Sequence, residues 1–167
     1  MEQTAAHAKI LKQYADGPAA LEAALAGLAE SDLDRALAED AWTIRQIVHH
    51  VTDGDDIWSI GIKAILGNPE GSFNLQWYWD RPQMEWAEKW QYASRPIEPS
   101  LALLRANRQH ILDLVRRLPD AWEQSTHIRW PQGEEEHITV GDVLEMQAGH
   151  VFGHIGDIER IRRSHHL

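Results

Sequence analysis

The amino-acid sequence predicts an all-α fold, an antiparallel four-helix bundle with a long aromatic connection and a small β-hairpin before the last helix. Four long stretches place apolar residues three or four positions apart, the spacing of one face of an α-helix. Turn-forming residues separate these stretches at Asn68-Pro69, Pro119 and Gly133. The chain has 167 residues, 43% of them hydrophobic. That is enough for one core, so we expect residues 1–167 to form a single bundle domain.

The first half of the chain predicts two of these helices. Residues 2–28 are expected to be helical with an interruption near residues 16–18, because Pro18 is best tolerated in the first turn of a new helical segment. The second helix is expected at residues 43–66, where a threonine can cap its first turn and a Gly-Asn-Pro sequence follows its last one.

Residues 67–99 form a long connection rich in Gly, Pro and aromatic residues. A short helix is expected within it, from about Gln83 to Ala93. An ordered connection of this length in a small domain often forms the wall or lid of a functional site. Trp77, Tyr78 and Trp79 can line such a wall, which makes Trp77 and Trp79 candidates for substrate contact, although covering one end of the bundle is a simpler role for all three.

The third long helix is expected from Ser100 to Leu118, with apolar residues alternating at spacings of three and four, as in bundle packing. Arg108 interrupts this apolar stripe. Its aliphatic stem can lie along the core while its guanidinium reaches solvent at the edge. Alternatively, the guanidinium can face an anionic substrate in a central cavity, which makes Arg108 a candidate substrate-binding residue.

The last third of the chain predicts a hairpin followed by a long helix. Residues 127–130 and 136–139 are expected to form two strands around a Pro-Gln-Gly turn. The last helix is expected from Thr139 to Arg163. Thr139 can cap its first turn, and the acidic residues near its start and the arginines near its end suit the helix dipole.

Charge and composition exclude several classes of function. The chain has 16 basic and 26 acidic residues and a formal net charge of −10, which repels the phosphate backbone of nucleic acids. It has no Cys, which excludes disulfides, a thiolate nucleophile and a Cys-type zinc site. No apolar run approaches the ~18–20 residues of a membrane span, and no signal peptide is recognised. We therefore expect a cytoplasmic protein without nucleic-acid or membrane partners.

Two histidines stand four residues apart on the apolar face of the last helix. At about 100° per residue, His150 and His154 fall in line with Val143 and Ile161, where a core is expected. A buried imidazole is costly unless something binds its nitrogens, and two histidines at i and i+4 are a common pair of metal ligands. Val151 stands where a zinc-protease motif requires Glu. Because the chain has 10 His, such a pair also arises by chance, so a third ligand is decisive.

The second helix supplies a candidate third ligand. His50 lies at the edge of its apolar stripe, whereas His49 projects almost opposite. We therefore expect His50 to join His150 and His154, and His49 to be exposed to solvent or to contact a partner. Imidazole ligands favour zinc, nickel, copper or iron over magnesium or calcium.

Several short motifs, in this order, resemble the DinB-like superfamily of four-helix-bundle proteins. They are Trp42-Thr43, His50 with Asp53 after it, and a last helix with His-x-x-x-His. Other features are similar to its YfiT-like branch: the aromatic loop with Trp79-Asp80 and Trp86, the Leu-Ala-Leu-Leu start of the third helix, and the hairpin. The resemblance covers about residues 13–162.

The resemblance implies that His50, His150 and His154 hold one divalent metal, often nickel or zinc, in a bundle commonly found as a homodimer. It implies either a thiol S-transferase that uses a low-molecular-weight thiol (bacillithiol, mycothiol or glutathione) or a metal-dependent hydrolase. Either enzyme would act on a small molecule. Family members often carry Gln where this chain has Asp157.

Two carboxylates are candidates for catalysis. Asp53 follows His50 and Asp157 follows His154 by about one turn, so that either can orient a ligand or act as a base. For Asp53, a charge on the helix surface is the simpler interpretation. The competing class is a non-catalytic metal- or ligand-binding bundle whose histidines are structural. Four protein ligands would favour that class, and three ligands beside a cavity would favour an enzyme.

Overall fold

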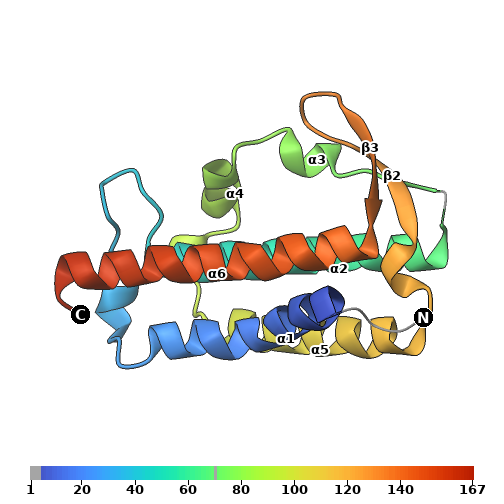
Figure 1. The fold of residues 1–167 in the computed structure, drawn as a ribbon. Coiled ribbons are helices and arrows are strands. Elements are labelled where there is room, and N and C mark those ends of the chain that lie inside the picture. Colours follow the sequence, from blue (N-terminus) through green and yellow to red (C-terminus); the bar gives the residue numbers. More distant parts are fainter. Residues whose placement is uncertain (1–4, 70) are drawn as a thin grey trace.

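The computed structural model describes residues 5–69 and 71–167, and its four long helices form a bundle (Figure 1). These helices are α1 (Ala5–Leu25), α2 (Ile44–Gly67), α5 (Glu98–Arg117) and α6 (Val140–His165). Helices α1 and α2 each pack against both α5 and α6. The predicted four-helix bundle is confirmed. Within the described residues, no helix is both long and apolar enough to cross a membrane.

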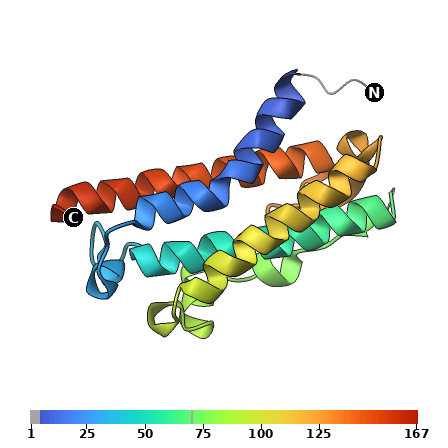
Figure 2. The same cartoon turned by 90° about the horizontal axis from the view of Figure 1, so that it is seen from below.

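The long connection after α2 determines the direction in which the helices run. It returns the chain along the outside of the bundle, so that α5 runs in the same direction as α2 (Figure 1). Figure 2 shows that α1 and α6 also share a direction, opposite to that of α2 and α5. The pairs α2/α6 and α1/α5 are therefore antiparallel. The first of these pairs carries all three predicted metal ligands.

The connection itself contains short elements and many aromatic side chains. Its elements are β1 (Ser72–Phe73), α3 (Gln76–Trp79), α4 (Gln83–Lys89) and a 3-10 turn, η2 (Tyr92–Ser94). The rings of Trp86 and Trp90 stack with centroids 4.7 Å apart. The predicted helix from Gln83 to Ala93 ends earlier, at Lys89, because Gln91 takes a left-handed conformation with a φ of 57°.

The predicted hairpin is confirmed by β2 (Ser125–Arg129) and β3 (Glu135–Thr139), which pair antiparallel with His127 opposite His137. Gly133 in the turn has a φ of 90°, which glycine adopts without steric cost. Strand β1 pairs parallel to β2 and makes a three-stranded sheet that the sequence did not predict. A strand of two residues is too short to show an alternating pattern.

Helix α1 differs from the expectation, because it runs without interruption through Pro18. Figure 2 shows that it bends near its middle. Proline has no N–H to donate to the carbonyl of the residue four positions earlier, here Tyr14. Arg108 of α5 donates to that carbonyl instead, at 2.8 Å. A hydrogen bond from another helix thus replaces the missing one.

Threonine caps begin the two helices that carry the predicted ligands. Thr43 accepts a hydrogen bond from the backbone of Gln46, whose side chain accepts one from the Thr43 N–H. Thr139 and Asp142 form the same reciprocal pair at the start of α6. These capping boxes confirm both predicted caps and fix where the helices start. Two further 3-10 turns, η1 (Glu30–Asp34) and η3 (Ala121–Glu123), precede α2 and β2.

Candidate metal centre

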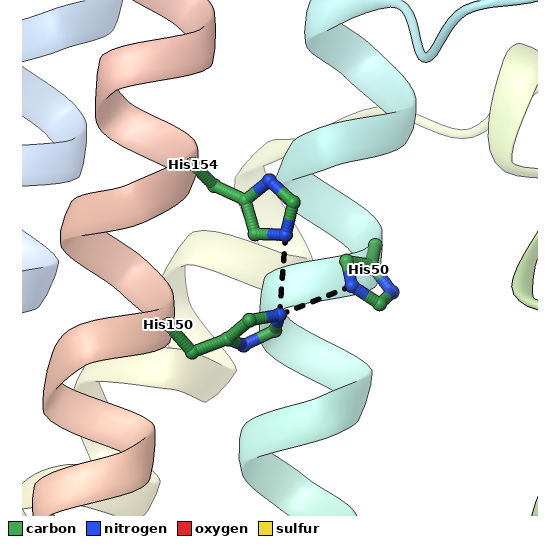
Figure 3. A group of neighbouring side chains, drawn as sticks. All are labelled: His50, His150 and His154. Atoms are coloured by element: carbon green, nitrogen blue, oxygen red, sulfur yellow. Dashed lines mark hydrogen bonds between the residues drawn. The ribbon is translucent and has the colours of Figure 1, made fainter.

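Three imidazole rings from α2 and α6 converge on one point, as Figure 3 shows. The Nε2 atom of His150 lies 3.1 Å from Nε2 of His50 and 3.1 Å from Nε2 of His154. One nitrogen from each ring lies within 4.8 Å of the other two. The antiparallel packing of α2 on α6 thus brings together residues that are 100 positions apart in the chain.

The environment of these rings keeps two of them neutral. Burial, and then the proximity of His150 and His154, lowers the pKa of His50 to about 3. Burial, followed by the charges of His154 and Arg108, lowers the pKa of His150 to about 4. Both rings therefore keep a nitrogen lone pair available at neutral pH, as a metal ligand requires.

Asp157 fixes the proton of the third ring. Its Oδ2 atom lies 2.9 Å from Nδ1 of His154, so the carboxylate accepts a hydrogen bond from the Nδ1–H group. The Nε2 atom of His154 is then the unprotonated nitrogen, and it points toward His150. A carboxylate that orients a histidine in this way is typical of metal sites. Arg160 binds the other oxygen of Asp157 and holds the carboxylate in place.

The distances from Nε2 of His150 to the other two nitrogens fit one divalent ion. With metal–nitrogen bonds of about 2.1 Å, two ligand nitrogens stand about 3.0 Å apart at a right angle and about 3.4 Å apart at a tetrahedral angle. The observed 3.1 Å lies between these values. Hydrogen bonds between the rings satisfy this cluster poorly. Nε2 of His150 carries at most one hydrogen, but two other ring nitrogens lie at the same distance from it. A cation would accept all three lone pairs.

His49 contradicts the expectation that it is exposed or contacts a partner molecule. Its side chain is fully buried, and its Nδ1 accepts a hydrogen bond from the hydroxyl of Ser100 at 2.8 Å. Its Nε2–H donates to the backbone carbonyl of Arg95 at 3.2 Å. The prediction was wrong because α2 has a second buried face, which packs against α5 and η2. Both ring nitrogens of His49 are thus bonded outside the three-histidine cluster.

A cavity of about 200 Å³ adjoins the cluster. His50 and His150 form part of its wall, so the convergent nitrogens border a space that a small molecule can occupy. The other lining residues are Gly54, Trp58, Tyr78, Gln83, Met146 and Gln147. Tyr78 is one of the three aromatic residues of the long connection that were expected as a wall, and it does line this cavity. The sequence did not single out Trp58, since it fits the ordinary apolar stripe of α2.

The two tryptophans proposed for substrate contact lie elsewhere. Trp79 stacks on Trp130 of the hairpin with ring centroids 5.4 Å apart, which is the covering role. Trp77 is 51% exposed and lines a separate groove on the outside of α2, together with Asp53. Asp53 accepts a hydrogen bond from the Tyr92 hydroxyl at 2.6 Å. These residues do not line the cavity beside the histidines.

Arg108 takes neither of the two positions that the sequence suggested, at the solvent-exposed edge or facing a substrate. Its side chain is 1% exposed, so the guanidinium does not reach solvent. Each of its three nitrogens donates to a protein oxygen, and these oxygens belong to Asp55, Tyr14 and Gln147. Arg108 therefore has no nitrogen directed toward a substrate. Non-local partners of this kind leave no pattern in the sequence.

Trp42 is a neighbour of the cluster that sequence reasoning left without a role. Its ring lies against that of His50, with centroids 4.7 Å apart. Its position directly before the helix cap Thr43 was the available signal, because the first turns of α2 lead to His50. Trp42 shields one side of His50 and contributes to the burial that keeps this ring neutral.

The fold and the site together define a class: four-helix-bundle proteins with three histidines converging between two antiparallel helices. The chain belongs to the DinB superfamily, whose family model matches residues 13–158. This confirms the family that the sequence motifs indicated.

Curated relatives extend this assignment. A protein of Geobacillus thermodenitrificans, named provisionally as a metal-dependent hydrolase, is 28% identical over 152 residues, which cover 87% of this chain and 78% of that protein. YfiT of Bacillus subtilis carries the same provisional name and is 28% identical over 148 residues, with the same coverage of both chains. The chain is thus similar to the YfiT-like branch over most of its length.

Solved structures agree with this relationship. The structure of YfiT from Bacillus subtilis, described as a probable metal-dependent hydrolase with an unusual four-helix bundle topology, superposes with a TM-score of 0.81 at 26% identity. The match covers 96% of this chain and 87% of that one. A mycothiol-dependent maleylpyruvate isomerase superposes with a TM-score of 0.64 at 18% identity, covering 90% of this chain and 60% of the other. This second similarity shows a shared fold alone.

Proposed function

We propose that this protein is a metal-dependent enzyme in which His50, His150 and His154 hold one divalent transition metal, with zinc and nickel as the first candidates. The observation that carries the proposal is the convergence of three Nε2 atoms at the wall of a cavity. Among the described residues, these three form the one group of histidines and carboxylates that could hold an ion. Three protein ligands leave at least one position for a small molecule.

The bound metal would supply Lewis acidity, which lowers the pKa of a coordinated thiol or water and makes it a nucleophile at neutral pH. The chain's own residues shape the space in which that nucleophile meets its substrate. Trp58, Tyr78 and Met146 give the cavity apolar walls. Gln83 accepts a hydrogen bond from the Tyr78 hydroxyl at 2.6 Å, which fixes the orientation of that ring.

The composition of the cavity wall favours a thiol over water as the nucleophile. Among the described residues that line it there is no carboxylate, and both candidate bases are engaged elsewhere, Asp53 with Tyr92 and Asp157 with His154. Hydrolysis usually requires a base to take a proton from water, whereas a thiol with a pKa of about 8.5 ionises readily beside a metal. We therefore propose a transferase that joins a low-molecular-weight thiol to a small electrophile. The thiol gives its proton to solvent, the thiolate forms a carbon–sulfur bond with the electrophile, and the leaving group departs with the electron pair of the bond that breaks.

Hydrolysis is the second candidate, and the names of the YfiT-like relatives favour it. Tag-free, metal-loaded protein would be assayed with glutathione, mycothiol or bacillithiol and a chlorinated aromatic electrophile, and in parallel with activated esters without thiol. Thiol-dependent chloride release that His150→Ala abolishes would support the transferase. Ester cleavage independent of thiol would support the hydrolase instead. Tight metal binding without either reaction would support a structural metal site, the non-enzymatic alternative.

The hydrogen bond from His154 to Asp157 allows a sharper test of the site. Asp157→Asn should weaken metal binding by about tenfold or more, because the neutral amide no longer stabilises the proton on Nδ1. Asp53→Asn is the matched control, since Asp53 lies one turn from His50 but binds Tyr92. Isothermal titration with zinc would measure both affinities. Equal affinities for the two variants would contradict the orienting role of Asp157.

A further inference from the structure

A buried arginine lies at the point where all four long helices meet. Arg108 projects from α5 and donates to Asp55 Oδ1 on α2 at 2.9 Å, to the Tyr14 carbonyl on α1 at 2.8 Å, and to the Gln147 carbonyl on α6 at 2.8 Å. Its guanidinium carbon also lies 4.2 Å from the centre of the Tyr14 ring. We call Arg108 with these three partners the Arg108 network.

Helix α1 is shaped to receive this guanidinium. Pro18 leaves the carbonyl of Tyr14 without its usual helical donor, and Arg108 Nη1 supplies the replacement. Gly17 provides the space, because a methyl group at that position would overlap Nη1 of Arg108. The Gly17-Pro18 pair, which the sequence suggested as a break in the helix, therefore serves as a docking point for a side chain of α5.

The Arg108 network lies beside the three-histidine cluster. Asp55 is five residues after His50 on α2, and Gln147 is three residues before His150 on α6. Gly54, next to Asp55, faces the His150 ring, since a Cβ atom there would lie 3.6 Å from its Cε1 atom. Arg108 thus joins α2 and α6 within about one and a half turns of the residues whose nitrogens must meet.

The interaction is too specific to be explained as a stabilising ion pair alone. Both charged side chains are buried, with exposures of 1% for Arg108 and 0% for Asp55. Removing both charges from water costs free energy that largely cancels their mutual attraction. An apolar pair of similar volume therefore often stabilises a core equally well. A guanidinium, however, fixes the distances to three helices at once, which apolar contacts do not.

We infer that Arg108 is a positioning residue for the metal centre, one that sets the separation of α2 and α6 at which His50, His150 and His154 converge. This inference rests on the proposed metal site. It predicts that displacing the guanidinium weakens metal binding even though no residue of the network is a ligand. Outer partners of metal sites typically contribute 10-fold to 100-fold to affinity, and we expect an effect of about 10-fold.

Gly17→Ala provides a gentle test, because it acts from α1, which carries no ligand, and leaves every charge in place. The added methyl pushes Arg108 Nη1 away, while alanine itself favours helix. Arg108→Lys is the second variant, since it keeps the charge but loses the planar fork that reaches three carbonyl or carboxylate groups. Both variants should fold, as judged by circular dichroism.

Arg45 offers a matched control. It is the other arginine buried among the described residues, and it binds Asp34 at 2.8 Å and Glu30 at 2.7 Å near the start of α2. It does not connect α2 with α6. Arg45→Met should therefore lower the free energy of unfolding without changing the metal site.

Cobalt(II) binding would be followed by its visible absorption spectrum, which reports the geometry of the ligands, beside urea unfolding of each variant. Gly17→Ala and Arg108→Lys should raise the dissociation constant by about 10-fold and alter the spectrum, whereas Arg45→Met should do neither. The inference would be overturned if Gly17→Ala and Arg108→Lys left the cobalt affinity and the spectrum unaltered while binding by the wild type depended on His150. Absence of cobalt binding in the wild type, or binding that survives His150→Ala, would instead reject the proposed metal site.

Discussion

Each of the variants His50→Ala, His150→Ala and His154→Ala should raise the dissociation constant for zinc by about 100-fold or more. This exceeds the effect of losing a residue that only orients a ligand. Each ring supplies one of three nitrogens that lie within 4.8 Å of one another, so each variant leaves only two ligands. Affinities would be measured by competition with a chelator of known affinity. Unchanged affinity in any one of the three variants would remove that residue from the site.

His49→Ala is the control for this series, because His49 is adjacent to His50 but bonded to Ser100 and Arg95. Metal affinity should stay nearly unchanged, while the free energy of unfolding should fall by about 1–3 kcal/mol, since the buried Ser100 hydroxyl loses its acceptor. The Arg95 carbonyl keeps its hydrogen bond from Arg45 at 3.3 Å. His127 and His137 face each other on the hairpin with ring centroids 4.0 Å apart, and such a surface pair can bind metal weakly by itself. His137→Ala is therefore a second control, which tests whether this pair contributes to the measured affinity.

The stability of the metal-free protein should fall steeply as the pH decreases from about 6.5 to about 4.5. In the unfolded chain a histidine has a pKa of about 6.5, whereas burial lowers the pKa of His50 to about 3 and that of His150 to about 4. The unfolded state therefore binds more protons across this window, and the free energy of unfolding decreases with decreasing pH. Burial raises the pKa of Asp55 to about 6, which acts in the opposite direction.

His50 and His150 against the one carboxyl of Asp55 leave a net difference of about one proton, or roughly 1 kcal/mol of unfolding free energy per pH unit. Burial also lowers the pKa of His49, which adds to this slope. Urea unfolding in the presence of a chelator would measure this slope. His50→Gln should flatten it, because one of the rings whose pKa is lowered by burial is removed. Zinc at about 100 times its dissociation constant should add about 2.7 kcal/mol to the stability at neutral pH. A slope that His50→Gln leaves unchanged would contradict the assigned burial effect.

The parts of the site that the sequence predicted depend on local periodicity. His150 and His154 share a face of one helix, and the edge position of His50 follows from the same geometry applied to α2. The hairpin and the caps at Thr43 and Thr139 also follow from short local patterns. These features confirm that helix faces and boundaries are encoded within a few residues.

The parts that the sequence did not predict depend on contacts between distant residues. His49 is buried because α5 and η2 cover a second face of α2, which a one-faced helical wheel does not represent. Helix α1 continues through Pro18 because Arg108, 94 residues away from Tyr14, supplies the missing donor. The direction of α5 follows from the course of the long connection. The homodimer, the metal identity and the cytoplasmic location stay predictions.

Anomalous diffraction from crystals soaked in zinc or nickel, with data collected at the absorption edge of the metal, would locate the bound ion. We expect one strong peak per chain among the Nε2 atoms of His50, His150 and His154, about 2.1 Å from each. In crystals of His150→Ala that peak should be lost. A peak located only between His127 and His137 on the hairpin, or no peak at all, would contradict the assignment of a metal centre to the bundle.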